Sequence, residues 1–480
     1  MIRSRRSRPA WACLSVAASL AGLSLPAHAQ RIAREPAPAR AVAPEGSWIE
    51  RAPSTAVVSG AQLRAFLAQA ATRRIDVVCL GDSNQLFAGH GWDHGLSKAL
   101  ADRWGLYATG LHFAGENVGN SAGVGYFAYT FSTAWTNLFA YAGAPADADR
   151  LLNSASSGLA PANYLYIAPG TVTPAGPNIG MAIDPGGPWN VSAAWRFHFT
   201  YAAFPAAGLQ PGWGVFRPMV RLNQAPWTWL AQATPIDARA NQIEPSAGVL
   251  ELPAASRPGG LNFRFSDPAT GITGPFVAYS MRAEQSSRTT GASVHTLYGK
   301  GGQSAYDFAR ALQLSSDDTL AWIFSQIRAL QPAPARVIVR INTGLNDRNE
   351  TERSLGPLGV LPGDSAEAYA DNLTAILNRI ESVWVGQGWE LSELAFLLTP
   401  SHAFSLPEDP ELVAYRAAAA QIARTRARVG MVDLGQILPA DQMLSRGFYQ
   451  SGGTDRAHLT QAGFEFLAAR ELDAIRWSRD

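Results

Sequence analysis

Continuous apolar stretches alternate with amphipathic helical patterns over much of this chain, and this alternation limits its fold class. The stretches typical of strands are 75–80 (IDVVCL), 293–299 (SVHTLYG), 336–342 (RVIVRIN), 393–400 (ELAFLLTP) and 429–434 (VGMVDL). Helical patterns lie at 61–73, 304–313, 318–331, 365–384 and 410–428, and a last helix begins near Leu459. Apolar strands linked through helices predict a parallel sheet that helices cover on both faces.

The pattern changes between about residue 126 and residue 290. Gly, Pro and Trp are dense there, helical periodicity fades, and short alternating runs such as WGVFRPMVRLN and LNFRFS appear. Short strands at turn-bounded spacing predict an all-β sandwich. Because both ends of this segment lie inside the α/β pattern, we expect residues 126–290 to form a domain inserted into an α/β domain of residues 47–125 and 291–480.

The first 29 residues have the pattern of a secretory signal peptide. Four arginines precede an apolar stretch from Ala10 to Leu25, and the small residues of AHA (27–29) suit cleavage. Residues 30–46 are rich in Pro and Ala, which predicts a linker. We therefore expect a secreted or periplasmic protein. Since no other stretch has 18 consecutive apolar residues, we expect no membrane span after cleavage.

Composition narrows the class of protein further. Apolar residues make up 47% of the chain and charged residues 16%, which predicts a packed globular protein and excludes a disordered one. Removing the signal leaves 35 basic and 38 acidic side chains, because it takes away four of the 39 basic residues and none of the acids. A net charge of −3 does not favour a nucleic acid partner.

Polar motifs follow several of the apolar strands at the point where each strand ends. Gly81-Asp82-Ser83-Asn84 follows the first strand, GKGGQS (299–304) ends the second, and TGLND (343–347) follows the third. A further motif, TDRAH (454–458), precedes the last helix. Because ligands bind beyond the carboxyl ends of the strands in sheets of this type, we expect these motifs to meet at one edge.

The side chains in these motifs suit acyl transfer by a serine. Ser83 can act as the nucleophile and His458 as its base, because an imidazole titrates near neutral pH. Asp455 comes three residues before the histidine, so one short loop can present both, and the carboxylate can orient the ring. The N–H groups of Ser83 and Gly302 and the side-chain amide of Asn346 can stabilise the oxyanion that forms on the substrate.

Together, the motifs G-D-S-N, G-G-Q-S, G-L-N-D and D-R-A-H resemble the four blocks of the SGNH/GDSL hydrolase superfamily. The resemblance implies a flavodoxin-like three-layer α/β fold and a serine ester hydrolase that needs no cofactor. The signature residues that it implies are Ser83, Gly302, Asn346 and His458, with Asp455 as the acid of the triad. Gly299 and Gly301 compete with Gly302 for the second position. Gly302 is preferred, because a Gly-x-Ser step that leads into a helix fits the family pattern best.

The predicted insert is similar in architecture to the jelly-roll, carbohydrate-binding-like modules of some SGNH enzymes. Those enzymes remove O-acetyl groups from polysaccharides, so we expect an acetylesterase that acts on an acylated carbohydrate or cell-wall polymer. Two alternatives stay open: a polysaccharide O-acyltransferase with the same triad, and a lipase or arylesterase for other esters. A binding protein with a relic site is disfavoured, because the serine, histidine and aspartate are all present.

Three further residues are expected at the rim of the substrate site: Asn84, His90 and Trp227, the last in the stretch QAPWTWLAQ. His90 and His94 also have the i, i+4 spacing of a metal-binding pair. The sequence offers no third ligand beside them, and the triad supplies a base without a metal. We therefore expect no metal site.

Overall fold

The computed structural model describes the larger part of this 480-residue chain. The described residues are 56–85, 91–113, 123–124, 127–131, 136–137, 165–167, 179–183, 194–205, 214–222, 228–231, 235–240, 244–252, 261–264, 276–299, 303–349 and 364–478. The expected signal peptide (1–29) and linker (30–46) lie outside these residues. The following description concerns the unit that spans Arg51–Asp480.

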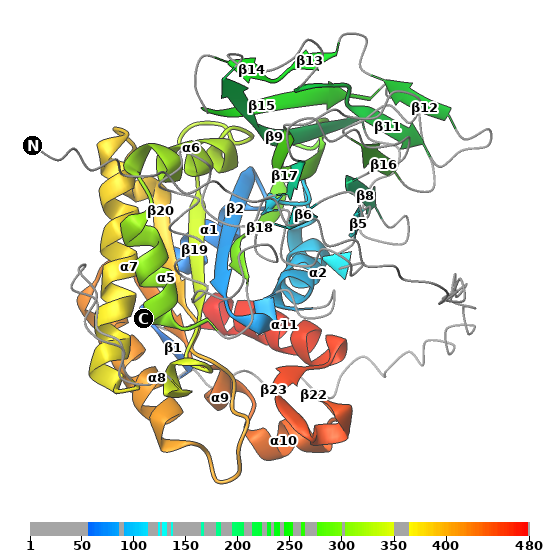
Figure 1. Cartoon of the computed structure of the whole chain (residues 1–480). Helices are drawn as coiled ribbons and strands as arrows, with labels where there is room; N and C mark the ends of the chain where they lie inside the picture. Colours follow the sequence, from blue (N-terminus) through cyan, green and yellow to red (C-terminus); the bar gives the residue numbers. More distant parts are fainter. Residues whose placement is uncertain are drawn as a thin grey trace, which may run out of the picture. The chain divides into compact units, whose positions relative to one another are not determined.

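Five parallel strands form the centre of the largest sheet (Figure 1), in the order β21-β20-β19-β2-β18. Their bounds are β2 (Arg74–Gly81), β18 (Gly291–Gly299), β19 (Val337–Asn342), β20 (Leu394–Leu398) and β21 (Val429–Val432), and the short β1 (Val57–Val58) pairs antiparallel to β21. The predicted strands and the parallel sheet are confirmed. Strand β21 ends before the predicted residue 434, because the Asp433 side chain accepts the N–H of Gln436 and caps the next helix.

Helices cover both faces of this parallel part of the sheet (Figure 1). One face packs against α1 (Ala61–Gln69), α2 (Trp92–Trp104), α9 (Leu434–Ile437) and α11 (Gln461–Trp477), and the other against α5 (Ala305–Leu314), α6 (Asp317–Arg328), α7 (Ala366–Gly386) and α8 (Pro410–Thr425). The alternation of side chains along strand β2 shows why both faces of the sheet need to be covered. Ile75, Val77 and Cys79 belong to the first hydrophobic core, whereas Val78 and Leu80 belong to the second, since successive side chains of a strand point to opposite faces.

Further strands, most of them paired antiparallel, extend the same sheet beyond β18. They are β3 (His112–Phe113, parallel to β18 and antiparallel to β17), β17 (Phe276–Gln285), β7 (Leu165–Ile167), β6 (Thr136–Asn137), β9 (Trp195–Pro205), β14 (Arg239–Ala240, parallel to β9) and β15 (Glu244–Glu251). Strand β17 pairs with both β3 and β9, and it leads directly into β18. The β-rich segment therefore shares a sheet with the α/β part, whereas the domain boundaries at 126 and 290 stay a prediction.

Separate antiparallel sheets complete the β-rich part. Six strands form one sheet: β12 (Thr228–Ala231), β11 (Met219–Leu222), β16 (Leu261–Arg264), β8 (Ile179–Ile183), β5 (Phe127–Phe131) and β4 (Gly123–Val124). A small sheet in this part pairs β10 (Val215–Phe216) with β13 (Ile236–Asp237). Outside the β-rich part, another small sheet pairs β22 (Tyr449–Gln450) with β23 (Asp455–Leu459), which follows α10 (Ala440–Ser445). The structure is thus a mixed α/β protein with short-stranded antiparallel sheets.

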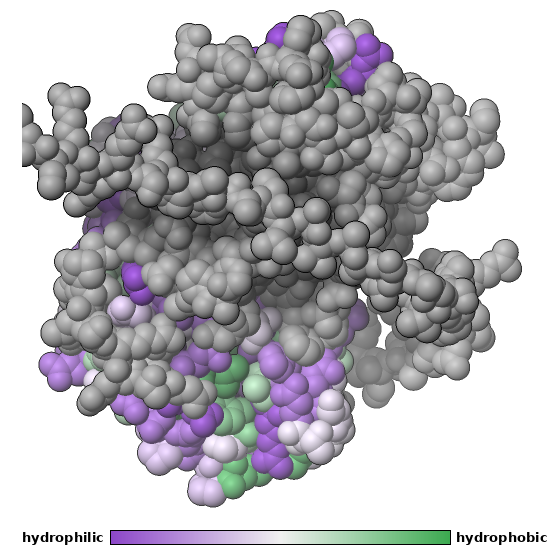
Figure 2. All heavy atoms as spheres, viewed as in Figure 1, coloured by the Kyte–Doolittle hydropathy of each residue, from purple (hydrophilic) through white to green (hydrophobic). Residues whose placement is uncertain are grey.

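The described surface mixes polar and apolar residues. Figure 2 shows hydrophobic and hydrophilic residues side by side on the lower part of the face that it draws. Large exposed apolar side chains include Leu406, Val413, Leu444 and Trp477, and single exposed apolar residues of this kind are ordinary on folded proteins. Among the described residues, no helix combines the length and the apolar character that crossing a membrane requires.

Candidate active site

Three of the predicted motifs start at the same level of the central sheet. In the strand register, Gly81 at the end of β2 pairs with Gly299 at the end of β18 and with Asn342 at the end of β19. The loops that follow these three neighbouring parallel strands therefore begin side by side. The loops that carry Ser83 and Asn346 both begin at this carboxyl edge, where the sequence motifs predict the site.

Ser83 opens a short 3₁₀ turn directly after β2 and is half-buried. The Asp82 carboxylate fixes this turn, because its Oδ1 accepts the backbone N–H of Asn84 at 2.9 Å. The Gln85 side chain donates to Thr296 Oγ1 on β18 at 3.2 Å. The turn is thus braced from within through Asp82 and tied to β18 through Gln85, which holds the Ser83 hydroxyl at the end of β2.

His458 and Asp455 lie on β23 and meet Ser83 across 375 positions of sequence. His458 Nε2 is 2.9 Å from Ser83 Oγ, and His458 Nδ1 is 2.9 Å from Asp455 Oδ2. With its proton on Nδ1 donated to the carboxylate, the ring offers the Nε2 lone pair to the serine hydroxyl. The structure brings these three predicted residues together in a serine–histidine–aspartate chain, the geometry of an activated nucleophile.

Local hydrogen-bond donors stabilise the negative charge on the Asp455 carboxylate. Partial burial raises the pKa of Asp455, but the hydrogen bond and charge of His458 and the backbone N–H groups outweigh this and hold the pKa below its usual range. Its Oδ1 accepts the N–H groups of Ala457 at 3.1 Å and His458 at 3.2 Å. The carboxylate is therefore ionised near neutral pH, as a group that orients and stabilises an imidazolium must be.

Asn346 lies in the loop after β19, next to the strand that leads to Ser83. Its Nδ2 donates to the Gln303 carbonyl at 2.9 Å, which orients the amide and leaves a second N–H for another acceptor. Asp347 ties the same loop down, since it accepts the N–H of Gly344 at 2.8 Å and that of Ala305, the first residue of α5, at 2.9 Å. These hydrogen bonds join the motif at 343–347 to the motif at 299–304 and to the start of α5.

Several predicted residues lie outside the described part of the chain. Gly302 and Gly301, two of the glycines considered for the second motif, are among them, and Gly299 is the last residue of β18. His90 and Trp227, expected at the substrate rim, are outside it too. Their roles stay predictions.

Asn84 is not at an exposed rim, and that expectation is corrected. The residue is 1% exposed, and its Nδ2 donates to the Ala457 carbonyl at 3.1 Å and to Asp82 Oδ1 at 3.2 Å. It thus links the turn of Ser83 to the segment of His458.

Burial raises the pKa of Asp82 to about 6, against the lowering effect of the two hydrogen bonds that the backbone N–H and the side-chain amide of Asn84 donate to it.

His94, the second half of the predicted histidine pair, is bonded within the protein. Its Nε2 lies 2.9 Å from Glu465 Oε1 and 3.2 Å from Gln461 Nε2. Asp93 beside it accepts the hydroxyl of Thr296 at 2.9 Å. Among the residues that the structure describes, no group of three or more His, Cys, Asp or Glu side chains is arranged to hold a metal ion.

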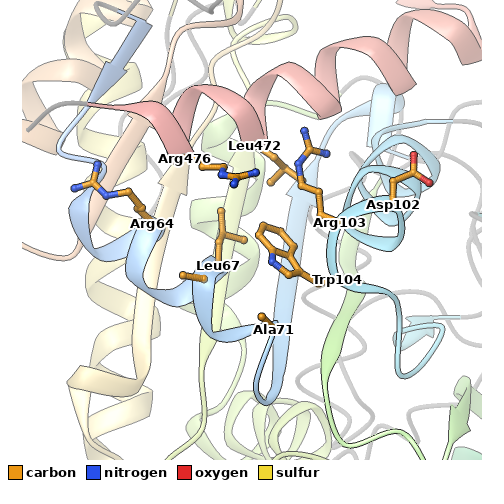
Figure 3. A pocket seen from close by; sticks show the side chains of 9 residues that line it. Arg64, Leu67, Ala71, Asp102, Arg103, Trp104, Leu472 and Arg476 are labelled. Carbon is orange, nitrogen blue, oxygen red and sulfur yellow. The ribbon is translucent and has the colours of Figure 1, made fainter. Parts of the chain in front are cut away.

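A cavity of about 600 Å³ lies apart from the triad, between α1, the end of α2 and the end of α11 (Figure 3). The residues that line it are Arg64, Leu67, Ala68, Ala71, Asp102, Arg103, Trp104, Leu472 and Arg476. Two of its arginines are already bonded, Arg64 to the Ser478 carbonyl and Arg103 to Asp473. The triad residues do not line this cavity, so it is separate from the site of Ser83.

Sequence patterns alone do not single out two buried polar residues, His402 and Arg340. His402 follows β20 and contacts the segment of Asp455, and its place after a predicted strand was the available signal. Arg340 interrupts the apolar run of β19 and forms a fully buried ion pair with Glu471 on α11. A charge inside an apolar strand predicts a buried partner, but the sequence does not identify which carboxylate it is.

Comparisons with known proteins give remote likenesses. No protein-family model matches the chain, and no curated protein matches it. A solved peptidoglycan O-acetylesterase is 12% identical, with 88% of this chain and 95% of that chain covered at a TM-score of 0.48. A carbohydrate acetylesterase from Sinorhizobium meliloti is 14% identical, covering 38% of this chain and 77% of that one at a TM-score of 0.24. A carbohydrate esterase family 2 enzyme with a carbohydrate-binding domain, from Corynascus thermopiles (Myceliophthora fergusii), is 14% identical, covering 65% and 98% at a TM-score of 0.26.

Proposed function

We propose that the chain is a serine ester hydrolase of the SGNH/GDSL type. The observation that carries the proposal is the hydrogen-bonded chain from Ser83 Oγ through His458 to Asp455, with both bonds at 2.9 Å. Ester hydrolysis needs a hydroxyl with a base in reach and a carboxylate that orients the base. These groups sit on a loop after β2 and on β23, at the edge of a parallel sheet where ligands bind.

The strand order supports the fold that the sequence resemblance implies. Numbered along the chain, the parallel strands β2, β18, β19, β20 and β21 lie in the order 2-1-3-4-5, which is the order of flavodoxin-like sheets. In this order the chain direction across the sheet reverses beside the first strand, between β2 and β19. Ser83 leaves the sheet at this switch point, where such folds leave a crevice.

The proposed reaction passes through an acyl-enzyme. His458 Nε2 takes the proton of Ser83 as Oγ attacks the ester carbonyl carbon, and the tetrahedral intermediate collapses as the imidazolium returns that proton to the leaving alcohol. Water then attacks the acyl-serine, with His458 again as the base, and the carboxylic acid and free Ser83 are released. The N–H of Ser83, the Asn346 amide and the N–H of Gly302 are the proposed donors to the oxyanion.

For the substrate, we propose a short-chain acyl ester, an O-acetyl group, on a carbohydrate or cell-wall polymer. The proposal follows from the motifs and from the large β-rich segment next to the α/β part, and it does not rest on the solved acetylesterases, whose TM-scores lie below 0.5. Export to the periplasm or medium, proposed from residues 1–29, would bring the protein to such a polymer.

The test is a substrate screen with product analysis. Acetylated xylan, acetylated peptidoglycan and aryl esters of short and long chains are incubated with the protein and with the Ser83→Ala variant, and free carboxylic acid is measured. The proposal predicts acetate release from an acetylated glycan by the wild type and none above background by the variant. Acetyl transfer to an added glycan without free acetate supports an acyltransferase, and preference for long-chain esters supports a lipase.

A further inference from the structure

The segment that carries the proposed base is held by side chains from other parts of the sheet edge. The carbonyl of Arg456 lies 3.2 Å from His402 Nε2, and the next carbonyl, that of Ala457, accepts Asn84 Nδ2 at 3.1 Å. Both carbonyls lie between Asp455 and His458. Two successive peptide groups are thus fixed from outside, and the imidazole of His458 follows their position.

His402 is built into the protein as a rigid donor. It is 1% exposed, and it follows β20 in a loop whose neighbouring residue Ser401 donates its N–H to the Thr343 carbonyl at 2.8 Å and accepts Arg416 Nη2 at 3.1 Å. Burial lowers the pKa of His402 to about 4, against the opposing effect of its bond to the Arg456 carbonyl. A neutral ring that faces a carbonyl through Nε2 must carry its proton on that nitrogen, because a carbonyl only accepts.

We infer that His402 is a positioning residue for the proposed triad: its Nε2–H holds the Arg456 carbonyl and thereby sets His458 at bonding distance from Ser83. The inference rests on the proposed function and adds a residue from the loop after β20. His402 does not contact Ser83 through any hydrogen bond that the structure describes, so it acts through the backbone of β23. A displacement of about 1 Å at a reacting group can lower the rate by about a hundredfold.

The test compares four variants with the wild type on one ester substrate. His402→Leu removes the donor, His402→Gln restores an N–H near the position of Nε2, and His402→Asn carries the same amide on a shorter side chain. Tyr449→Phe is the matched control, because its ring lies 6.3 Å from that of His402 while its buried hydroxyl donates to the Ala403 carbonyl and not to β23. Melting temperature, kcat and KM are measured for each, and Ser83→Ala is assayed alongside.

The inference predicts that His402→Leu and His402→Asn lose about 10- to 100-fold in kcat with KM changed less than about twofold. His402→Gln and Tyr449→Phe stay within about threefold of the wild type. The inference is overturned by a His402→Leu variant with wild-type kcat, by a His402→Gln variant as slow as His402→Asn, or by a Tyr449→Phe variant as slow as His402→Leu. An active Ser83→Ala variant overturns the proposed function itself. If His402→Leu does not fold, the comparison of kcat between His402→Gln and His402→Asn decides whether the inference holds.

Discussion

His458 Nε2 lies 2.9 Å from Ser83 Oγ, although 375 positions separate the two residues in the chain. This is the distance at which an imidazole accepts a hydroxyl proton. We predict that His458→Ala lowers kcat by about 10⁴-fold while the protein stays folded, because the side chain is partly exposed. His94→Ala is the matched control: it removes an imidazole bonded to Glu465 and should keep activity within a few-fold. Equal losses in the two variants would contradict the assignment of the base.

A second prediction concerns the carboxylate behind the histidine. Asp455 accepts His458 Nδ1 through one oxygen and two backbone N–H groups through the other. Asp455→Asn keeps the shape but can donate to Nδ1, which favours the ring tautomer that cannot accept the serine proton at Nε2. The expected loss in kcat is about 10³- to 10⁴-fold with little change in KM. Steady-state kinetics check it, and a loss below tenfold would remove Asp455 from the triad.

The third prediction concerns the buried ion pair between β19 and α11. Arg340 donates to Glu471 through two hydrogen bonds of 2.8 Å, and both side chains are fully buried. Glu471→Gln leaves the guanidinium charge without its counterion, so the free energy of unfolding should fall by about 3–5 kcal/mol. Chemical denaturation measures it. Asp102→Ala, which breaks the exposed pair with Lys98, is the control and should cost less than about 1 kcal/mol. Similar costs for the two variants would contradict this account.

The fourth prediction is a pH dependence of stability. His402 has its pKa lowered by burial to about 4 in the folded protein, whereas an unfolded histidine titrates near 6.5. The stability linked to this group is therefore present above pH 6.5 and is lost as the pH falls toward 4, because only the unfolded chain takes up the proton. From pH 7 to pH 5, His402→Gln should lose about 2 kcal/mol less than the wild type.

Urea denaturation at the two pH values checks this fourth prediction. Asp82, whose pKa burial raises to about 6, titrates in the same range, but it is present in both proteins and cancels from the difference. Parallel losses of stability in the wild type and His402→Gln would show that His402 takes up a proton equally in the folded and unfolded chains.

The central part of the fold was predictable because its signals are local. An apolar run such as that of β2 can be buried completely only inside a sheet that is covered on both faces. The helices around it show a helical periodicity of apolar residues in their own sequences. The candidate site could be proposed for a related reason, since Ser83 follows such a strand and His458 comes shortly before the last helix. The mixed α/β architecture with a parallel sheet therefore followed from the sequence.

The rest depended on contacts that no local pattern encodes. Short alternating runs predicted strands between residues 126 and 290, but pairing partners are set by packing, and β17 pairs with β3 inside the central sheet. Glu284 on β17 also bonds Arg74 on β2 at 2.7 Å. A deletion of residues 126–290 would remove this contact, so a test of the β-rich segment should keep residues 276–290. Asn84 was misplaced for the same reason, because its partner Ala457 lies 373 positions away.

Covalent labelling of the nucleophile tests the central claim most directly. A fluorophosphonate, which reacts with serines activated by a base, is incubated with the wild type, with Ser83→Ala and with Ser451→Ala, a control for the exposed serine just before β23. Peptide mass spectrometry then locates the adduct. The account predicts one adduct, on Ser83, in the wild type and in Ser451→Ala, and none in Ser83→Ala, which should also lose at least about 10⁴-fold in kcat. An adduct on a different serine, or undiminished turnover by Ser83→Ala, would contradict it.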